Sequence, residues 1–173
     1  MYLIGIFAKD KVVKLEGLPQ SSVGAPCPTV IADEHHLMVA FYLEVRDDKL
    51  DGTTVRVVGP ETEGEPFAIV TFKGTLAYFH GPPNDEAFGG HPLAKRGLGP
   101  YGAFEVKNST WLQHLTKMNR VHPYHKDAHY AAYRHLILTF HDTTFECITK
   151  TYEIVAGVGS LRGAMDTMIG TMK

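Results

Sequence analysis

Short apolar segments separated by turn residues make up most of the chain and limit the folds open to it. The segments with the branched and aromatic content of strands are residues 2–8, 12–15, 37–45, 53–58, 67–72, 75–79, 135–140 and 145–155. Helical spacing of apolar residues occurs in residues 109–120 and 160–172. Many strands with two late helices predict an α+β fold with a mainly antiparallel sheet, either open or curled into a barrel or half-barrel. The length predicts a single domain over residues 1–173.

Two pairs of strand segments are predicted to be neighbours in the sheet. The segments on either side of Gly74 are predicted to form a hairpin, or one long strand that bends at this glycine. The last two strand segments flank a turn at residues 142–143, and in the predicted register Leu138 lies opposite Cys147. Both side chains then belong to an apolar face. We therefore predict that Cys147 is a buried core residue rather than a nucleophile.

A residue suited to capping precedes each helical segment. Asn108 or Ser109 can cap the first helix, and Ser160 can cap the second. Two internal glycines weaken the second helix by about 1 kcal/mol each relative to alanine, so we expect its apolar stripe to pack on the sheet. The same stripe makes residues 160–172 the candidate surface for a homo-oligomer.

The charge and the cysteine content exclude several classes of partner and site. The formal net charge is −2, so there is no basic surplus to hold a nucleic acid backbone. No segment is apolar over the length needed to cross a bilayer, and the first apolar run ends at Lys9, too early for a signal peptide. Cys27 and Cys147 do not form a CxxC pair. We therefore expect a cytoplasmic protein with free thiols that binds neither nucleic acid nor membrane.

The stretch GLGPYG, residues 97–102, matches the GxGxxG pattern of dinucleotide-binding loops. Such a loop follows a strand and begins a helix, whose amides then meet the pyrophosphate. Here the preceding HPLAKR does not resemble a strand, and the following AFEV has the pattern of an extended segment. We therefore expect a glycine-rich connection, with Lys95 and Arg96 as the remaining indication of an anion site.

Histidine is the unusual residue of this chain, with ten in total and five in NRVHPYHKDAHYAAYRHLILTFHD. Residues 123–134 fit either a helix or a strand, and the sequence does not decide between them. In a helix, His125 and His129 lie about 6 Å apart on one face, a spacing that suits a shared metal ion. In a strand, residues six positions apart lie roughly 20 Å apart, so His129, His135 and His141 cannot share one ion.

The irregular segment 81–102 is the other place where polar residues gather. A loop of this length is usually functional or mobile. Its carboxylates and histidines suit a mixed nitrogen–oxygen site. We predict a pocket between the sheet, this loop and the histidine-rich segment, with Arg134 holding an anionic group. The residues predicted to bind the ligand are Asp85, Glu86, His91, Tyr101, His125, His129 and Arg134.

Binding of a small molecule in this polar pocket is the function that the sequence favours. The alternative is a metal-dependent hydrolase or oxygenase, in which a divalent metal would be the cofactor. Its predicted ligands are His91, His125, His129 and Glu86. A third hypothesis is an interaction protein that self-associates through residues 160–172.

Overall fold

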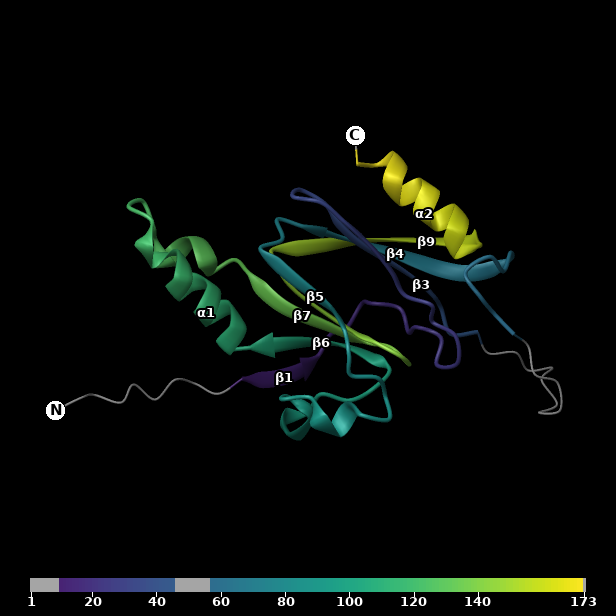
Figure 1. Cartoon of the computed structure of the whole chain (residues 1–173), viewed down its shortest axis with the longest axis horizontal. Coiled ribbons are helices and arrows are strands. Elements are labelled where there is room, and N and C mark those ends of the chain that lie inside the picture. Colours follow the sequence, from purple (N-terminus) through teal and green to yellow (C-terminus); the bar gives the residue numbers. More distant parts are fainter. Residues whose placement is uncertain (1–9, 46–56, 173) are drawn as a thin grey trace.

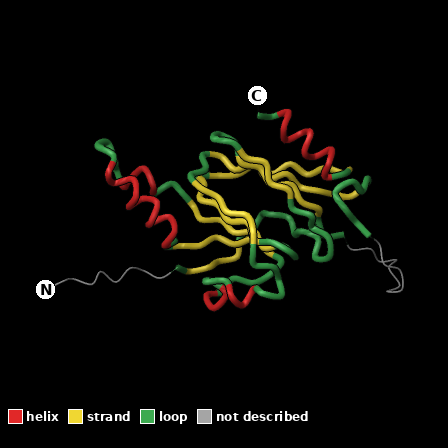
Figure 2. The backbone as a smooth tube through the Cα atoms, in the orientation of Figure 1, coloured by secondary structure: helices red, strands yellow, loops and turns green. Residues whose placement is uncertain are grey.

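A computed structural model gives the fold of residues 10–45 and 57–172, the part of the chain that the structure describes. Its strands form two antiparallel sheets that stack face to face, with one helix beside the strand ends of one sheet and another over the outer face of the other (Figures 1 and 2). The helices are α1 (Thr110–Met118) and α2 (Leu161–Gly170). The predicted α+β class and both predicted helices are confirmed, while the described strands close no barrel.

Each sheet is antiparallel throughout. The five-stranded sheet has the order β1-β6-β7-β8-β5, and the four-stranded sheet has the order β2-β3-β4-β9. The strands of the first are β1 (Lys11–Lys14), β6 (Gly102–Lys107), β7 (Arg134–Thr139), β8 (Thr144–Thr149) and β5 (Ala77–Gly81). Those of the second are β2 (Thr29–Ala32), β3 (Leu37–Tyr42), β4 (Glu65–Lys73) and β9 (Thr151–Gly159). The strand predicted at residues 2–8, and most of the one predicted at 53–58, lie outside the described residues.

The main core lies between the two sheets and follows from the period-two alternation of the strands. Alternate residues of β3 and β4 meet alternate residues of β7 and β8 there. Aromatic pairs join the layers: the ring centroids of Phe41 and Phe140 lie 5.3 Å apart, as do those of Phe72 and Phe145. Cys147 is fully buried in this core, so the structural role predicted for it is confirmed.

The outer face of the four-stranded sheet and part of the outer face of the five-stranded sheet are covered as well (Figure 1). Helix α2 lies on the four-stranded sheet, where Leu161, Ala164 and Met168 pack against β3 and β4. The loop between β5 and β6 carries the 3-10 helices η1 (Phe88–Gly90) and η2 (Ala94–Arg96), and its apolar residues cover Val106 and Ile137 of the five-stranded sheet. The apolar stripe of residues 160–172 is thus used within the chain, and the predicted homo-oligomer remains a prediction.

The chain passes from one sheet to the other at a shared corner. β4 pairs with β3 and β9, whereas β5 pairs with β8 in the other sheet, so the hairpin predicted around Gly74 is wrong. The chain does bend at Gly74, which adopts a φ of 65° that glycine tolerates without strain. The alternative of one long bent strand is not formed, because β4 ends at Lys73 and β5 begins at Ala77 in the other sheet. The single strand predicted over 145–155 is also wrong, because it divides at Lys150, whose amide donates to the Lys73 carbonyl at 3.2 Å.

The turn of the β7–β8 hairpin lies one residue earlier in the chain than the sequence predicts. The Phe140 amide donates to the Thr143 carbonyl, so Leu138 lies opposite Phe145 rather than Cys147. The predicted register is therefore wrong by two residues. Because side chains alternate with a period of two, a slip of two residues leaves every side chain on its predicted face.

Residues 123–134 form neither of the two regular structures considered for them. After α1 come the 3-10 helices η3 (Asn119–Val121) and η4 (Asp127–Tyr130), and β7 begins only at Arg134. The glycine-rich stretch 97–102 leads into a strand, as predicted for a plain connection. None of the helices in the described ranges is long and apolar enough to span a membrane.

Two neighbouring residues of α2 test its packing. Met168 is 1% exposed against the sheet, whereas Ile169 is 56% exposed. We expect Met168→Ala to lower the free energy of unfolding by about 2–4 kcal/mol, because it leaves a cavity under the helix. The change Ile169→Ala should stay within about 0.5 kcal/mol of the wild type. Urea unfolding followed by circular dichroism measures both, and equal losses would contradict the observed orientation of α2.

Candidate functional site

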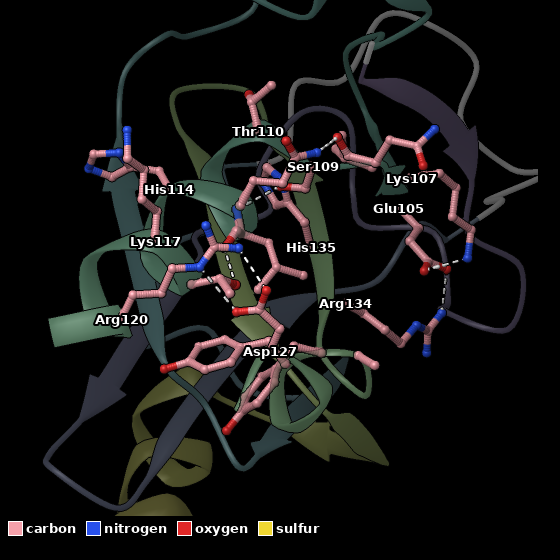
Figure 3. A pocket seen from close by; sticks show the side chains of 18 residues that line it. Glu105, Lys107, Ser109, Thr110, His114, Lys117, Arg120, Asp127, Arg134 and His135 are labelled. Carbon is pink, nitrogen blue, oxygen red and sulfur yellow. Dashed lines mark hydrogen bonds and ion pairs between the residues drawn. The ribbon is translucent and has the colours of Figure 1, made fainter. Parts of the chain in front are cut away.

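A groove of about 1120 Å³ lies between α1, the segment around η4 and the ends of β6 and β7 (Figure 3). Two other hollows of the described structure measure about 330 and 180 Å³. Pockets for small organic ligands measure about 300–1000 Å³. The groove is therefore large enough for such a ligand.

The upper end of the groove is built by the turn that joins β6 to α1. Asn108 has a φ of 58°, a left-handed conformation that asparagine tolerates better than most residues. Ser109 follows as the N-cap of α1, and its Oγ accepts a hydrogen bond of 3.1 Å from the Leu112 amide. The Asp10 carboxylate accepts from the Thr110 amide at 2.6 Å and fixes the same turn from outside. The capping predicted for Ser109 is confirmed.

A chain of hydrogen bonds runs from Ser109 into the outer face of the five-stranded sheet. Ser109 Oγ lies 2.9 Å from His135 Nδ1, and His135 Nε2 lies 2.8 Å from Glu146 Oε2. The second carboxylate oxygen of Glu146 lies 3.0 Å from His91 Nε2. The side chains of His91, His135 and Glu146 are 6%, 5% and 16% exposed, so water has little access to the chain.

The hydrogen-bond partners determine which ring nitrogen of each histidine carries the proton. The Leu93 amide donates to His91 Nδ1 at 3.1 Å, so neutral His91 carries its proton on Nε2 and donates it to Glu146. An ionised carboxylate only accepts, so neutral His135 also donates through Nε2. Its Nδ1 is then an acceptor, and the Ser109 hydroxyl donates to it. Every donor meets an acceptor in this arrangement.

The Glu146 carboxyl is held in its ionised form. Burial by itself would raise its pKa, but the hydrogen bonds from His135 and His91 outweigh burial and lower the pKa below the ordinary value of 4.5. The Trp111 ring packs against the His135 imidazole in a T-shaped contact, with 5.2 Å between the ring centroids. The histidine is thus oriented by the carboxylate on one side and by α1 on the other.

Charged side chains line the rest of the groove. Four are cationic, namely Lys107, Lys117, Arg120 and Arg134, and two are anionic, namely Glu105 and Asp127. Figure 3 shows Lys117 and Arg120 on one side of His135, with Arg134 and Glu105 on the other. Glu105 accepts hydrogen bonds from Arg134 and Lys107. Burial is the largest single effect on the pKa of Glu105 and would raise it, but these hydrogen bonds and charges together lower the pKa below its ordinary value. The groove has a surplus of two positive charges.

Lys117 differs from the other three cations of the groove. Arg120 binds Asp127 at 2.7 Å, and Lys107 and Arg134 share Glu105. Lys117 is exposed and has no carboxylate partner among the residues that the structure describes. Its ammonium group is therefore the cation of the groove that no described carboxylate neutralises.

The structure does not bring the seven predicted ligand-binding residues together. Arg134 lines the groove, and His91 reaches the hydrogen-bonded chain behind it. His125 is bonded to Asp127, whereas His129 is exposed, and neither lines the groove.

The remaining three predicted residues, Asp85, Glu86 and Tyr101, belong to the far end of β7. The Tyr101 hydroxyl donates to Asp85, whose amide donates to the His141 carbonyl at 2.9 Å. Glu86 is exposed beside Asp85. His141 lies just beyond the end of β7 and Arg134 at its start, roughly 20 Å apart at the rise of a strand. This cluster is therefore separate from the groove.

The four predicted metal ligands are also not brought together. His91 is bonded to Glu146 and His125 to Asp127, while His129 and Glu86 are exposed. Over residues 10–45 and 57–172, no group of three or more histidine, cysteine, aspartate or glutamate side chains could hold a metal ion. The described geometry therefore gives the metal prediction no support.

Three residues of the hydrogen-bonded chain were not predicted as site residues. The sequence predicts Ser109 only as a helix cap and His135 only as a strand residue, and it predicts no role for Glu146. The detectable signal was the alternation of β7 and β8. In the observed register Ile137 lies opposite Glu146, which makes His135 and Glu146 diagonal neighbours on one face.

The lowered pKa of Glu146 predicts a pH-dependent contribution to stability. A carboxyl with a lower pKa in the folded state stabilises the protein fully above the ordinary value of 4.5, and this stabilisation is lost as the pH falls through the lowered value. We expect Glu146→Gln to cost about 1–3 kcal/mol at pH 7, because the amide cannot accept from both histidines. Urea unfolding should show this deficit shrinking towards pH 3.

The exposed Glu153, which pairs with Lys73 on the other sheet, provides the matched control. We expect Glu153→Gln to change the free energy of unfolding by less than about 0.5 kcal/mol across the same pH range. A Glu146→Gln deficit that stays constant from pH 7 to pH 3 would contradict the assignment of an ionised Glu146.

No protein-family model matches the chain, and no significant match was found among curated proteins or solved structures. Conclusions about function therefore depend on the geometry of the groove and of the hydrogen-bonded chain behind it.

Proposed function

We propose that this chain binds a small organic anion in the groove between α1 and the ends of β6 and β7. The observation that carries the proposal is the surplus of two positive charges in a groove of about 1120 Å³. A site of this volume accommodates a molecule the size of a metabolite. Lys117, which has no carboxylate partner among the described residues, supplies a charge that a ligand can neutralise.

The walls of the groove support an organic ligand rather than a free inorganic ion. Tyr130 and Tyr133 line it with ring centroids 5.9 Å apart, and Leu112 adds an apolar side chain from α1. Aromatic and aliphatic walls favour a carbon framework, and the cations fix its charged end. Arg134, the residue predicted to hold the anion, contributes to this wall while bound to Glu105.

This proposal keeps the binding function expected from the sequence and changes the place of the pocket. The segments after α1 contribute as expected, whereas Asp85, Glu86 and Tyr101 belong elsewhere. A cytoplasmic location remains part of the proposal, which the two unpaired cysteines support.

Titration with phenyl phosphate tests the proposal. We expect amide resonances of residues around the groove to shift in nitrogen-15 NMR spectra, and benzylamine, a cation of similar size, to cause no such shifts. The change Lys117→Glu should weaken binding of phenyl phosphate by about tenfold, because it replaces attraction by repulsion.

Lys95, an exposed lysine of η2 outside the groove, provides the matched control. We expect Lys95→Glu to leave the dissociation constant of phenyl phosphate within about twofold of the wild type. Equal weakening by both substitutions would show a general effect of net charge. Shifts confined to residues outside the groove would refute the proposed site.

A further inference from the structure

The hydrogen-bonded chain at the groove has the order of groups found in enzymes that use an activated serine. We propose that Ser109, His135 and Glu146 form a catalytic triad that hydrolyses carboxylic esters bearing an anionic group. The selection of anionic esters rests on the function proposed above, whereas the triad itself stands on its own geometry.

The distances meet what nucleophilic catalysis requires. A serine hydroxyl needs a base at about 2.6–3.2 Å, and the base needs a third group that orients it. Ser109 Oγ is 2.9 Å from His135 Nδ1, and His135 Nε2 is 2.8 Å from Glu146. Here Nδ1 faces the serine and Nε2 faces the carboxylate. Either imidazole nitrogen can act as a base, and the roles follow from geometry.

A helix cap alone does not account for this arrangement. Ser160 caps α2 in the same way, with its Oγ accepting from the Gly163 amide at 3.2 Å, and has no histidine partner in the described part of the chain. Capping therefore needs the hydroxyl oxygen and nothing more. At Ser109 a histidine and a carboxylate, both largely removed from water, are added to the cap.

Ser109 and His135 are each 4% exposed and both line the groove, so the reacting residues lie in its wall, next to the proposed ligand (Figure 3). Lys117 and Arg120 line it as well. The surplus positive charge of the groove stabilises the negative charge that develops on the carbonyl oxygen during attack. The same cations select an ester whose other end is anionic.

The reaction balances with water as the second reactant. Ser109 Oγ attacks the ester carbonyl carbon, its proton moves to His135 Nδ1, and the carbon–oxygen bond to the leaving group breaks. The departing oxygen takes the proton from Nδ1 and leaves as an alcohol. Water then attacks the acyl-serine and gives a proton to Nδ1. The bond to Oγ breaks, the proton returns to Oγ, and a carboxylic acid is released. Glu146 stays ionised and stabilises the imidazolium.

The hydrolysis of 4-acetoxybenzoate and of phenyl acetate by the purified full chain tests the proposal. These esters carry the same acyl group, and only the first bears an anion. We expect the wild type to hydrolyse both and to prefer 4-acetoxybenzoate. The changes Ser109→Gly and His135→Gln should each lower kcat by at least about 10³-fold. Glycine at an N-cap costs the helix little, so Ser109→Gly separates the loss of the nucleophile from unfolding.

Ser160→Gly is the matched control, because it removes a helix cap with no histidine partner, and it should leave both rates unchanged. Labelling of the wild type with a fluorophosphonate probe tests whether Ser109 is an activated nucleophile, even if a variant fails to fold. We expect a single adduct, located on Ser109 by peptide mass spectrometry. The absence of an adduct on Ser109, or hydrolysis that persists in Ser109→Gly, would falsify the triad.

Titration of Ser109→Gly with phenyl phosphate distinguishes this failure from failure of the binding proposal. Binding that persists while the wild type lacks Ser109-dependent hydrolysis overturns the triad and leaves the anion site intact. Hydrolysis of phenyl acetate that depends on Ser109, without preference for the anionic ester, supports the triad and overturns the anion selection.

Discussion

The described site depends on the hydrogen bonds that the Glu146 carboxylate accepts. The carboxylate lies on the outer face of the five-stranded sheet with little access to water, where an unpaired charge would be costly. Hydrogen bonds from His91 and His135 compensate for this burial. His91 belongs to the loop before β6, and His135 reaches Ser109 at the start of α1. One carboxylate thereby connects the sheet, the covering loop and the helix that forms a wall of the groove.

The layers of the fold explain why a polar chain can exist on this face. The inner faces of both sheets form the apolar core, and α2 covers the outer face of the four-stranded sheet. On the five-stranded sheet, Phe88, Leu93 and Leu98 of the loop cover only part of the outer face. The groove opens beside this covered part. The network is therefore covered by the loop on one side, and on the other side Ser109 and His135 form part of the wall of the groove.

Local sequence patterns predict much of this fold but little of the site. Both helices, their serine caps and the faces of β7 and β8 follow from spacing and capping, which act over a few residues. The corner at Gly74 and Lys150, where the chain passes between the sheets, does not follow from these patterns. A strand that changes sheets shows the same alternation of apolar and polar residues as one that continues. The two-residue error in register placed Glu146 opposite Thr139 and separated it from His135. The contact of His91 with Glu146 joins segments 55 residues apart, which no local pattern reveals.

Capping and catalysis make compatible demands on Ser109. As a cap, its oxygen accepts the Leu112 amide proton, which leaves the hydroxyl proton free to be donated. The His135 Nδ1 acceptor receives that proton, because Glu146 holds the opposite ring nitrogen in its protonated form. The cap thus fixes the rotamer of the serine, and the carboxylate fixes the tautomer of the histidine. A nucleophile positioned in this way needs no rearrangement of its own to transfer its proton, and this preorganisation is what electrostatic accounts of catalysis require. The same hydrogen bonds that stabilise the start of α1 therefore prepare the serine for reaction.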